Sequence, residues 1–130
     1  MSYILDTDHC VAVLRGLLDV GSRVAPEIQL YVTAITVSEL TYGAYKSQRP
    51  ADNLAQVNTL LDGVTILAFD LAAARRCGMS KDLLRRAGAL IAEPDLQIAS
   101  IALQHGLPLA THNIEHFDRV PGLALVDWLL

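Results

Sequence analysis

Three carboxylates and one amide occupy positions from which they could together hold a divalent cation. Asp6 directly follows a short apolar run, Glu39 lies one turn into an expected helix, and Asp95 opens another helix. The amide, Asn113, follows an apolar run near the end of the chain. Mg²⁺ and Mn²⁺ prefer oxygen ligands and leave several positions to water and phosphate. Because such a cation activates bound water and balances phosphoryl charge, these residues predict metal-assisted phosphodiester hydrolysis.

Each of these residues also has a purely local explanation. Thr36 and Glu39 match a capping box, in which the glutamate bonds back to the start of its helix. Asp95 in a first turn stabilises the helix dipole. Asp6 or Asp8 could simply cap the first helix, and the amide could be an ordinary turn residue. The metal site is favoured over these local explanations only if the three acids lie close together in the folded protein.

The elements that must position these residues alternate along the chain. Short apolar runs predict strands at residues 3–5, 30–33, 64–67 and 107–110, with a short fifth at 123–126. Apolar spacing and caps predict helices from an Asp8 cap through Leu17, at 37–44, at 51–61, after an Asp70 cap, and at 94–104. This alternation predicts a single α/β domain over residues 1–130, with a mostly parallel central sheet flanked by helices. In such sheets ligands bind at the carboxyl ends of the strands, where the three acids would meet. Their repulsion would then require a cation.

Composition narrows the class of protein. The 130 residues are 52% hydrophobic and 18% charged, which is typical of a folded domain. The sequence lacks an apolar run of transmembrane length and a basic N-terminal region, so we expect a cytoplasmic protein that does not enter a membrane. Cys10 and Cys77 have no metal-ligand spacing and are expected to be reduced and partly buried.

The distribution of positive charge matters more than the total. The formal net charge of −4 argues against a nucleic-acid partner. Half of the ten basic residues nevertheless fall in one expected helix: Arg75, Arg76, Lys81, Arg85 and Arg86. They could form an RNA-binding rim beside the acidic pocket, or merely a solvated helix face.

Four segments, in order along the chain, resemble the motifs of PIN-domain ribonucleases, and in particular the VapC toxins of type II (VapBC) toxin–antitoxin systems. They are residues 5–8 (LDTD), 38–44 (SELTYGA), 95–102 (DLQIASIA) and 109–123 (LATHNIEHFDRVPGL). The resemblance covers essentially the whole chain. It implies a Mg²⁺-dependent endoribonuclease, with Mn²⁺ as the alternative ion, that cleaves structured RNA such as tRNA. It also implies a VapB-type antitoxin partner and a homodimer.

The resemblance assigns a role to each candidate residue. Asp6 and Asp95 would bind the metal, Glu39 would bind it directly or through water, and Asn113 would take the fourth catalytic position, where many PIN domains have Asp. Thr7 and Thr111 would support the pocket through hydrogen bonds.

Two departures from the family pattern bear on the metal. Asp8 stands where Asn is commoner, and His116 precedes Phe117 where many relatives have Glu. Asp8 would add a negative charge near the metal. Because Asn113 and His116 leave the last segment poor in carboxylates, we expect one firmly held ion and a second recruited by substrate. His116 is interpreted as a surface residue, with phosphate contact or proton transfer as the alternative. The other three histidines are interpreted as structural.

Two rival functions fit parts of this pattern. Asp6 and Asp8 match the D-x-D signature of haloacid-dehalogenase-type phosphohydrolases, in which Asp6 would be the nucleophile. That enzyme needs a lysine beside the phosphate, and this chain offers only Lys46 and Lys81. A non-catalytic PIN-like interaction module is the second rival, although such a module would be expected to have lost at least one of the three acids.

Overall fold

The computed structural model describes residues 2–130, which are arranged around a five-stranded parallel sheet. Its strands are β1 (Tyr3–Leu5), β2 (Leu30–Thr33), β3 (Thr65–Leu67), β4 (Leu109–Ala110) and β5 (Leu125–Val126). They lie in the order β3-β2-β1-β4-β5, and every neighbouring pair is parallel. The predicted α/β fold with a parallel sheet is therefore confirmed, and β1 lies at its centre.

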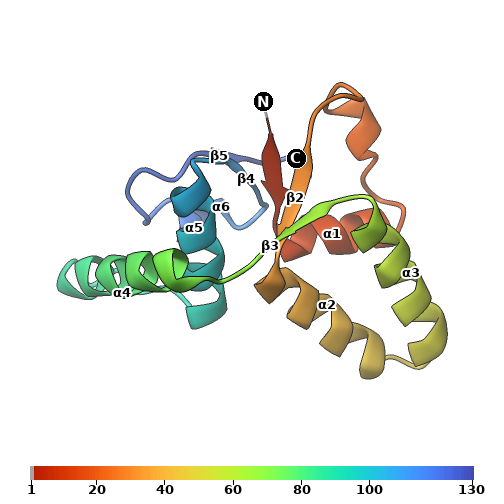
Figure 1. Cartoon of the computed structure of the whole chain (residues 1–130), viewed down its shortest axis with the longest axis horizontal. Coiled ribbons are helices and arrows are strands. Elements are labelled where there is room, and N and C mark those ends of the chain that lie inside the picture. Colours follow the sequence, from red (N-terminus) through yellow and green to blue (C-terminus); the bar gives the residue numbers. More distant parts are fainter. Residues whose placement is uncertain (1) are drawn as a thin grey trace.

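The helices cover both faces of this sheet (Figure 1). On one side lie α1 (Thr7–Leu14), α2 (Ala34–Tyr45) and α3 (Pro50–Asp62); on the other lie α4 (Leu71–Arg86) and α5 (Glu93–His105). Two short helices, η1 (Val20–Ser22) and α6 (Ile114–Phe117), complete the fold. Consecutive residues of a strand point to opposite faces, so Ile4 packs in the core beneath α4 and α5 while Leu5 packs in the core beneath α1, α2 and α3. Burial on both faces explains why β1 is apolar throughout.

Several helix ends follow the local signals in the sequence. The side chain of Asp70 accepts a hydrogen bond from the backbone N–H of Ala73 and so caps α4 as predicted. Pro94 lies in the first turn of α5, and Gly106 ends that helix with a φ of +62°, a conformation that favours glycine. The boundaries of α5 therefore differ from the prediction by one residue at each end.

The start of α2 corrects one of the local interpretations. The helix begins at Ala34, and its N-cap is Thr33, whose hydroxyl accepts a hydrogen bond from the backbone N–H of Thr36. Thr36 is therefore inside the helix, and the predicted capping box of Thr36 with Glu39 is wrong. The carboxylate of Glu39 is therefore not used to cap α2 and can bond to another partner.

The first helix also differs from its prediction. It begins at Thr7, so Asp8 lies within its first turn and is not its N-cap. It ends at Leu14 rather than continuing through Leu17, which is 73% exposed. The residue at the N-cap position is Asp6, whose side chain makes no capping hydrogen bond. The carboxylate of Asp6 is thus available for another purpose.

The two cysteines and the character of the helices complete the description of the fold. Cys10 and Cys77 are both free and buried. Within residues 2–130, every helix is too short or too polar to span a bilayer.

Candidate active site

Three neighbouring strands end at the same edge of the sheet and bring distant residues together. Asp6 follows β1, Thr33 ends β2, and Thr111 follows β4. The backbone N–H of Asp6 donates to the carbonyl of Ala110 at 2.9 Å, which ties the ends of β1 and β4 together. The parallel sheet thus places the start of α1, the start of α2 and the loop after β4 beside one another.

Asp6 is an acid in an unfavourable environment. Only 5% of its surface is exposed, and its Oδ2 accepts a hydrogen bond of 2.7 Å from the hydroxyl of Thr111. Burial raises the pKa of Asp6 strongly, the Thr111 hydrogen bond partly offsets this, and the charges of Asp8 and Asp95 raise it further, to about 7. A cation beside Asp6 would remove this penalty.

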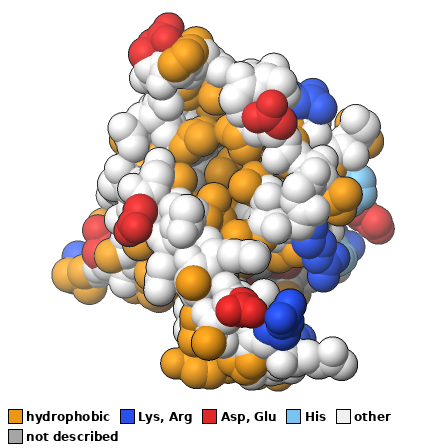
Figure 2. Space-filling view, turned by 90° about the vertical axis from the view of Figure 1, so that its right-hand side faces the viewer, with side chains coloured by type: hydrophobic (Ala, Val, Ile, Leu, Met, Phe, Trp, Pro, Cys, Tyr) orange, Lys and Arg blue, Asp and Glu red, His pale blue; other side chains and the backbone are white. Residues whose placement is uncertain are grey.

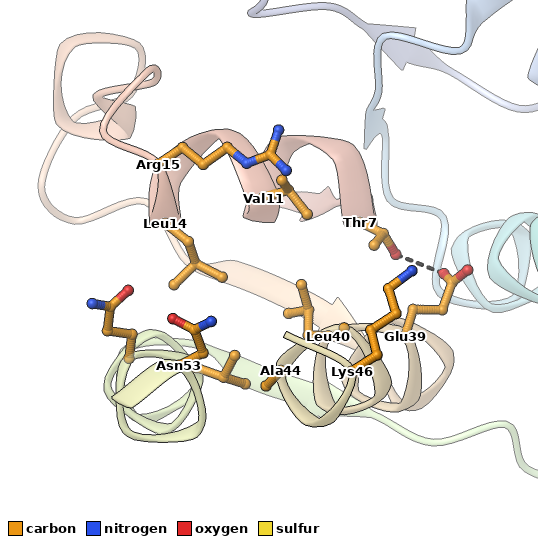
Figure 3. Close-up of a pocket in the computed structure, with 12 residues that line it drawn as sticks. Thr7, Val11, Leu14, Arg15, Glu39, Leu40, Ala44, Lys46 and Asn53 are labelled. Atoms are coloured by element: carbon orange, nitrogen blue, oxygen red, sulfur yellow. Dashed lines mark hydrogen bonds between the residues drawn. The ribbon is translucent and has the colours of Figure 1, made fainter. Parts of the chain in front are cut away.

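Glu39 reaches from α2 to the first residue of α1. Its Oε1 accepts a hydrogen bond of 2.7 Å from the hydroxyl of Thr7 (Figure 3). Since this hydroxyl has a single proton, Thr7 must accept in its 2.9 Å contact with the hydroxyl of Thr36. Thr7 therefore holds the carboxylate of Glu39 at the edge of the sheet, although the two residues are far apart in the sequence.

Asp95 approaches the same place from α5. It is half-buried, and its pKa is raised by burial and then by the negative charge of Glu39, with a smaller contribution from Asp8. Nearby His116 acts in the opposite direction on this pKa. Asp95 therefore lies within electrostatic range of both Glu39 and Asp6. Stabilisation of the helix dipole alone does not explain an acid placed beside two others.

Asn113 lies next to Thr111 on the loop after β4. Its backbone N–H donates to the Thr111 hydroxyl at 3.0 Å, and its side chain does not cap α6. The hydroxyl of Thr111 thus accepts from Asn113 and donates to Asp6. The backbone of Asn113 is therefore in contact with the residue that bonds to Asp6.

Asp8 has a role that the sequence did not indicate. Its carboxylate is bonded to the ring of His9 at 2.8 Å and to the backbone N–H of His112 at 2.9 Å. Burial opposes ionisation of Asp8, but the hydrogen bonds from His9 and His112 prevail and lower its pKa. Asp8 is therefore a charged anchor for the loop after β4.

The donor set fits a hard divalent cation held by few protein ligands. No three His, Cys, Asp or Glu side chains within residues 2–130 are already close enough together to hold a metal ion. Mg²⁺ does not need such a cluster, because it is usually bound by one or two carboxylates together with water and substrate phosphate. Asp6 and Asp95 supply two carboxylates whose pKa values are raised, mainly by burial and also by neighbouring acids. Glu39 offers a third oxygen donor beside them.

The basic residues of α4 are partly neutralised. Arg85 and Arg86 each form an ion pair of 2.8 Å with Asp82, and Lys81 pairs with Glu93 at 3.0 Å. All of these side chains are well exposed, so the pairs contribute little to stability. The pair with Glu93 connects α4 to the start of α5, two residues before Asp95.

The raised pKa of Asp6 predicts how the metal-free protein responds to pH. An unfolded Asp titrates near about 4, so the stability that Asp6 contributes is complete below that pH and is lost as the pH rises through about 7. Asp95 acts in the same direction. We expect the free energy of unfolding in EDTA to fall between about pH 5 and pH 8, by on the order of 1 kcal/mol per pKa unit. Urea denaturation at both pH values should show a smaller fall for Asp6→Asn, and an equal fall in both proteins would contradict this account.

Comparison with known proteins agrees with this geometry. Residues 3–123 match the PIN domain family. The chain is 37% identical to the ribonuclease VapC2 of Haemophilus influenzae over 99% of both chains, and 33% identical to the tRNA(fMet)-specific endonuclease VapC of Shigella flexneri over 98% of both. It superposes on the solved VapBC2 structure of Rickettsia felis with a TM-score of 0.91, at 30% identity, covering 98% of this chain and 99% of that one. The family match over most of the sequence and these full-length relatives show that the chain belongs to the PIN-domain family and, within it, to the VapC ribonucleases.

Proposed function

We propose that the protein is the toxin of a type II toxin–antitoxin system and an endoribonuclease that depends on Mg²⁺, with Mn²⁺ able to replace it. The observation that carries this proposal is the buried carboxylate of Asp6, whose pKa is raised toward 7 beside two further acids. PIN-domain ribonucleases generally depend on a divalent metal. When bound, the ion would supply an activated water and balance the charge on the phosphoryl group.

The residues of this chain divide the remaining work. Asp6 and Asp95 would hold the ion, and Glu39 would bind it directly or orient its water. Thr111 fixes Asp6 and Thr7 fixes Glu39, through hydrogen bonds of 2.7 Å each. Asn113 would contribute a neutral oxygen beside them. With no carboxylate at that position, we propose that a second ion enters only with the substrate.

The substrate is proposed to be structured RNA, such as tRNA. The Shigella flexneri relative is named for its specificity toward tRNA(fMet), and the Haemophilus influenzae relative is named a ribonuclease. The alternative of a D-x-D phosphohydrolase does not agree with membership of the PIN family. By resemblance to VapC toxins we also propose that the protein acts in the cytoplasm as a homodimer.

The catalytic assignment predicts a metal-dependent nuclease that one substitution abolishes. Purified protein should cut total RNA into discrete fragments with Mg²⁺ or Mn²⁺ and should be inactive in EDTA. Asp95→Ala should reduce the rate by at least about 100-fold, because it removes one of the two carboxylates proposed to hold the ion.

The matched control is Asp62→Ala, which removes an exposed acid at the end of α3 and should keep full activity. Cleavage that survives both EDTA and Asp95→Ala would reject the site. A folded wild-type protein that cuts no RNA would instead favour the non-catalytic interaction module.

We further propose that α4 supports RNA binding through its arginines. Arg75 and Arg76 lie on the same helix as Arg85 and Arg86. Arg85 and Arg86 share the single carboxylate of Asp82, so these three side chains at the end of the helix together carry a net charge of +1. The contribution of this end is therefore expected to be modest.

Charge reversal tests this role of α4. Arg85→Glu combined with Arg86→Glu should weaken RNA binding several-fold and lower the salt dependence of the affinity, because fewer phosphates are neutralised. Binding of labelled RNA in EDTA at several salt concentrations measures both effects. Unchanged affinity and salt dependence would leave these arginines as a solvated helix face.

We propose that a VapB-type antitoxin docks in the cavity between α1, α2 and α3. The cavity has a volume of about 400 Å³, and its walls include Val11, Leu14, Leu40 and Val57 (Figure 3). The face of the molecule on the side of α3 also has a hollow in which hydrophobic side chains gather (Figure 2). Thr7 and Glu39 form one end of the cavity, so an occupant would cover the proposed active site. Structural relatives were solved as VapBC complexes, from Salmonella typhimurium among others.

A charge placed in the cavity should separate antitoxin binding from catalysis. Leu14→Asp should weaken capture of the cognate antitoxin by at least about tenfold, because a buried unpaired carboxylate is costly, while RNA cleavage continues. Leu17→Asp, on an exposed side chain outside this cavity, is the control. Equal antitoxin affinity for the wild type and Leu14→Asp would place the interface elsewhere.

A further inference from the structure

A closed ring of hydrogen bonds connects the C-terminal segment with the loop that follows β4. The backbone N–H of Trp128 donates to Nε2 of His9 at 3.1 Å, and Nδ1 of His9 lies 2.8 Å from Oδ1 of Asp8. The other oxygen of Asp8 accepts from the backbone N–H of His112 at 2.9 Å. The imidazole Nδ1 of His112 then lies 2.8 Å from Oδ2 of Asp127. Because Asp127 precedes Trp128 in the chain, the peptide bond between them closes the ring of hydrogen bonds.

The partners of His9 settle how its proton is placed. His9 is fully buried, and its Nε2 must accept because a backbone N–H can only donate. Its proton is therefore on Nδ1, where it is donated to Asp8. Oδ1 of Asp127 lies 4.0 Å from Nε2, too far for a hydrogen bond, and instead accepts from the backbone N–H of Leu129 at 2.8 Å. Each group in the ring thus has a defined donor or acceptor.

The ring of hydrogen bonds holds His112, the middle residue of the loop 111–113, at two points. His112 is held through its backbone by Asp8 and through its side chain by Asp127, whose carboxylate is only 6% exposed. The residues on either side are Thr111, which donates to Asp6, and Asn113, which donates to Thr111. Holding His112 therefore holds the Thr111 hydroxyl against Asp6.

We propose that Asp127 is a positioning residue of the active site. Through His112 it keeps Thr111 and Asn113 in place beside Asp6, so that the carboxylate of Asp6 is oriented for a cation. This inference rests on the proposed function, because the orientation of Asp6 matters only if Asp6 binds the ion. It adds the C-terminal segment, which contains no proposed ligand, to the parts of the chain on which metal binding depends.

The test compares Asp127→Ala with Arg23→Ala in the full chain. Arg23 donates from Nη2 to the carbonyl of Trp128 at 3.1 Å, so its removal loosens the same segment but deletes none of the hydrogen bonds of the ring. We expect Asp127→Ala to accelerate hydrogen exchange of the His112 and Asn113 amides about tenfold and to weaken Mn²⁺ binding by about threefold to tenfold. NMR measures the exchange, and EPR titration measures Mn²⁺ binding without RNA. Arg23→Ala should change neither by more than about twofold. His112→Ala, at a side chain 60% exposed, is a second variant that keeps the fold and should behave like Asp127→Ala.

Four outcomes of this experiment would count against the positioning role of Asp127. Unchanged amide exchange in Asp127→Ala and His112→Ala would show that Asp127 does not hold the loop 111–113 through His112, which would overturn the proposal. Faster exchange with wild-type Mn²⁺ affinity would show a merely structural role and would overturn the positioning role. If the wild type itself neither binds Mn²⁺ nor cleaves RNA, the proposed function fails and the positioning role fails with it. A wild type that does both, beside variants that differ from it in neither, would refute the positioning role alone.

Discussion

Asp6 places a carboxylate at the carboxyl end of the central strand, where only 5% of the residue is exposed. Burial raises the pKa of Asp6, and the negative charges of Asp8 and Asp95 raise it further. One hydrogen bond from Thr111 partly offsets this, and the pKa of Asp6 remains near 7. The arrangement around this edge of the sheet can be understood as the means of keeping that carboxylate in place without neutralising it.

The parallel sheet makes this arrangement possible. Because β1, β2 and β4 end together, residues from the two ends of the chain and from α2 meet over one edge. Threonine hydroxyls then fix the acids: Thr111 holds Asp6, and Thr7 holds Glu39. These hydrogen bonds position negative charge without supplying a positive one, and under the proposed function a bound ion would supply it. A site of this kind reduces the stability of the metal-free fold in exchange for function, as is common where chemistry is performed.

Much of this arrangement can be predicted from the sequence, since it follows from local patterns and one topological rule. The apolar runs at residues 3–5 and 30–33 predict their strands, and parallel pairing then predicts that Asp6 and the helix that carries Glu39 begin at the same edge of the sheet. The start of α2 is less predictable, because Thr33 and Thr36 are equally good capping residues and only the end of β2 decides between them. The role of Asp8 is not predictable from one sequence. Its partner His112 is 104 residues away, and nothing local indicates that pairing.

The same distinction applies to charge. The basic residues of α4 are visible in the sequence, and the pair of Arg85 with Asp82 three residues earlier is local. The partner of Lys81, in contrast, depends on the packing of α4 against α5. The central claim, that Asp6 and Asp95 share one cation, is tested most directly by a crystal structure of the metal-free protein soaked in Mn²⁺, with anomalous diffraction data. The account predicts one strong anomalous peak about 2.1 Å from a carboxylate oxygen of each acid. A well-ordered site with no peak, or a peak that contacts neither acid, would contradict it.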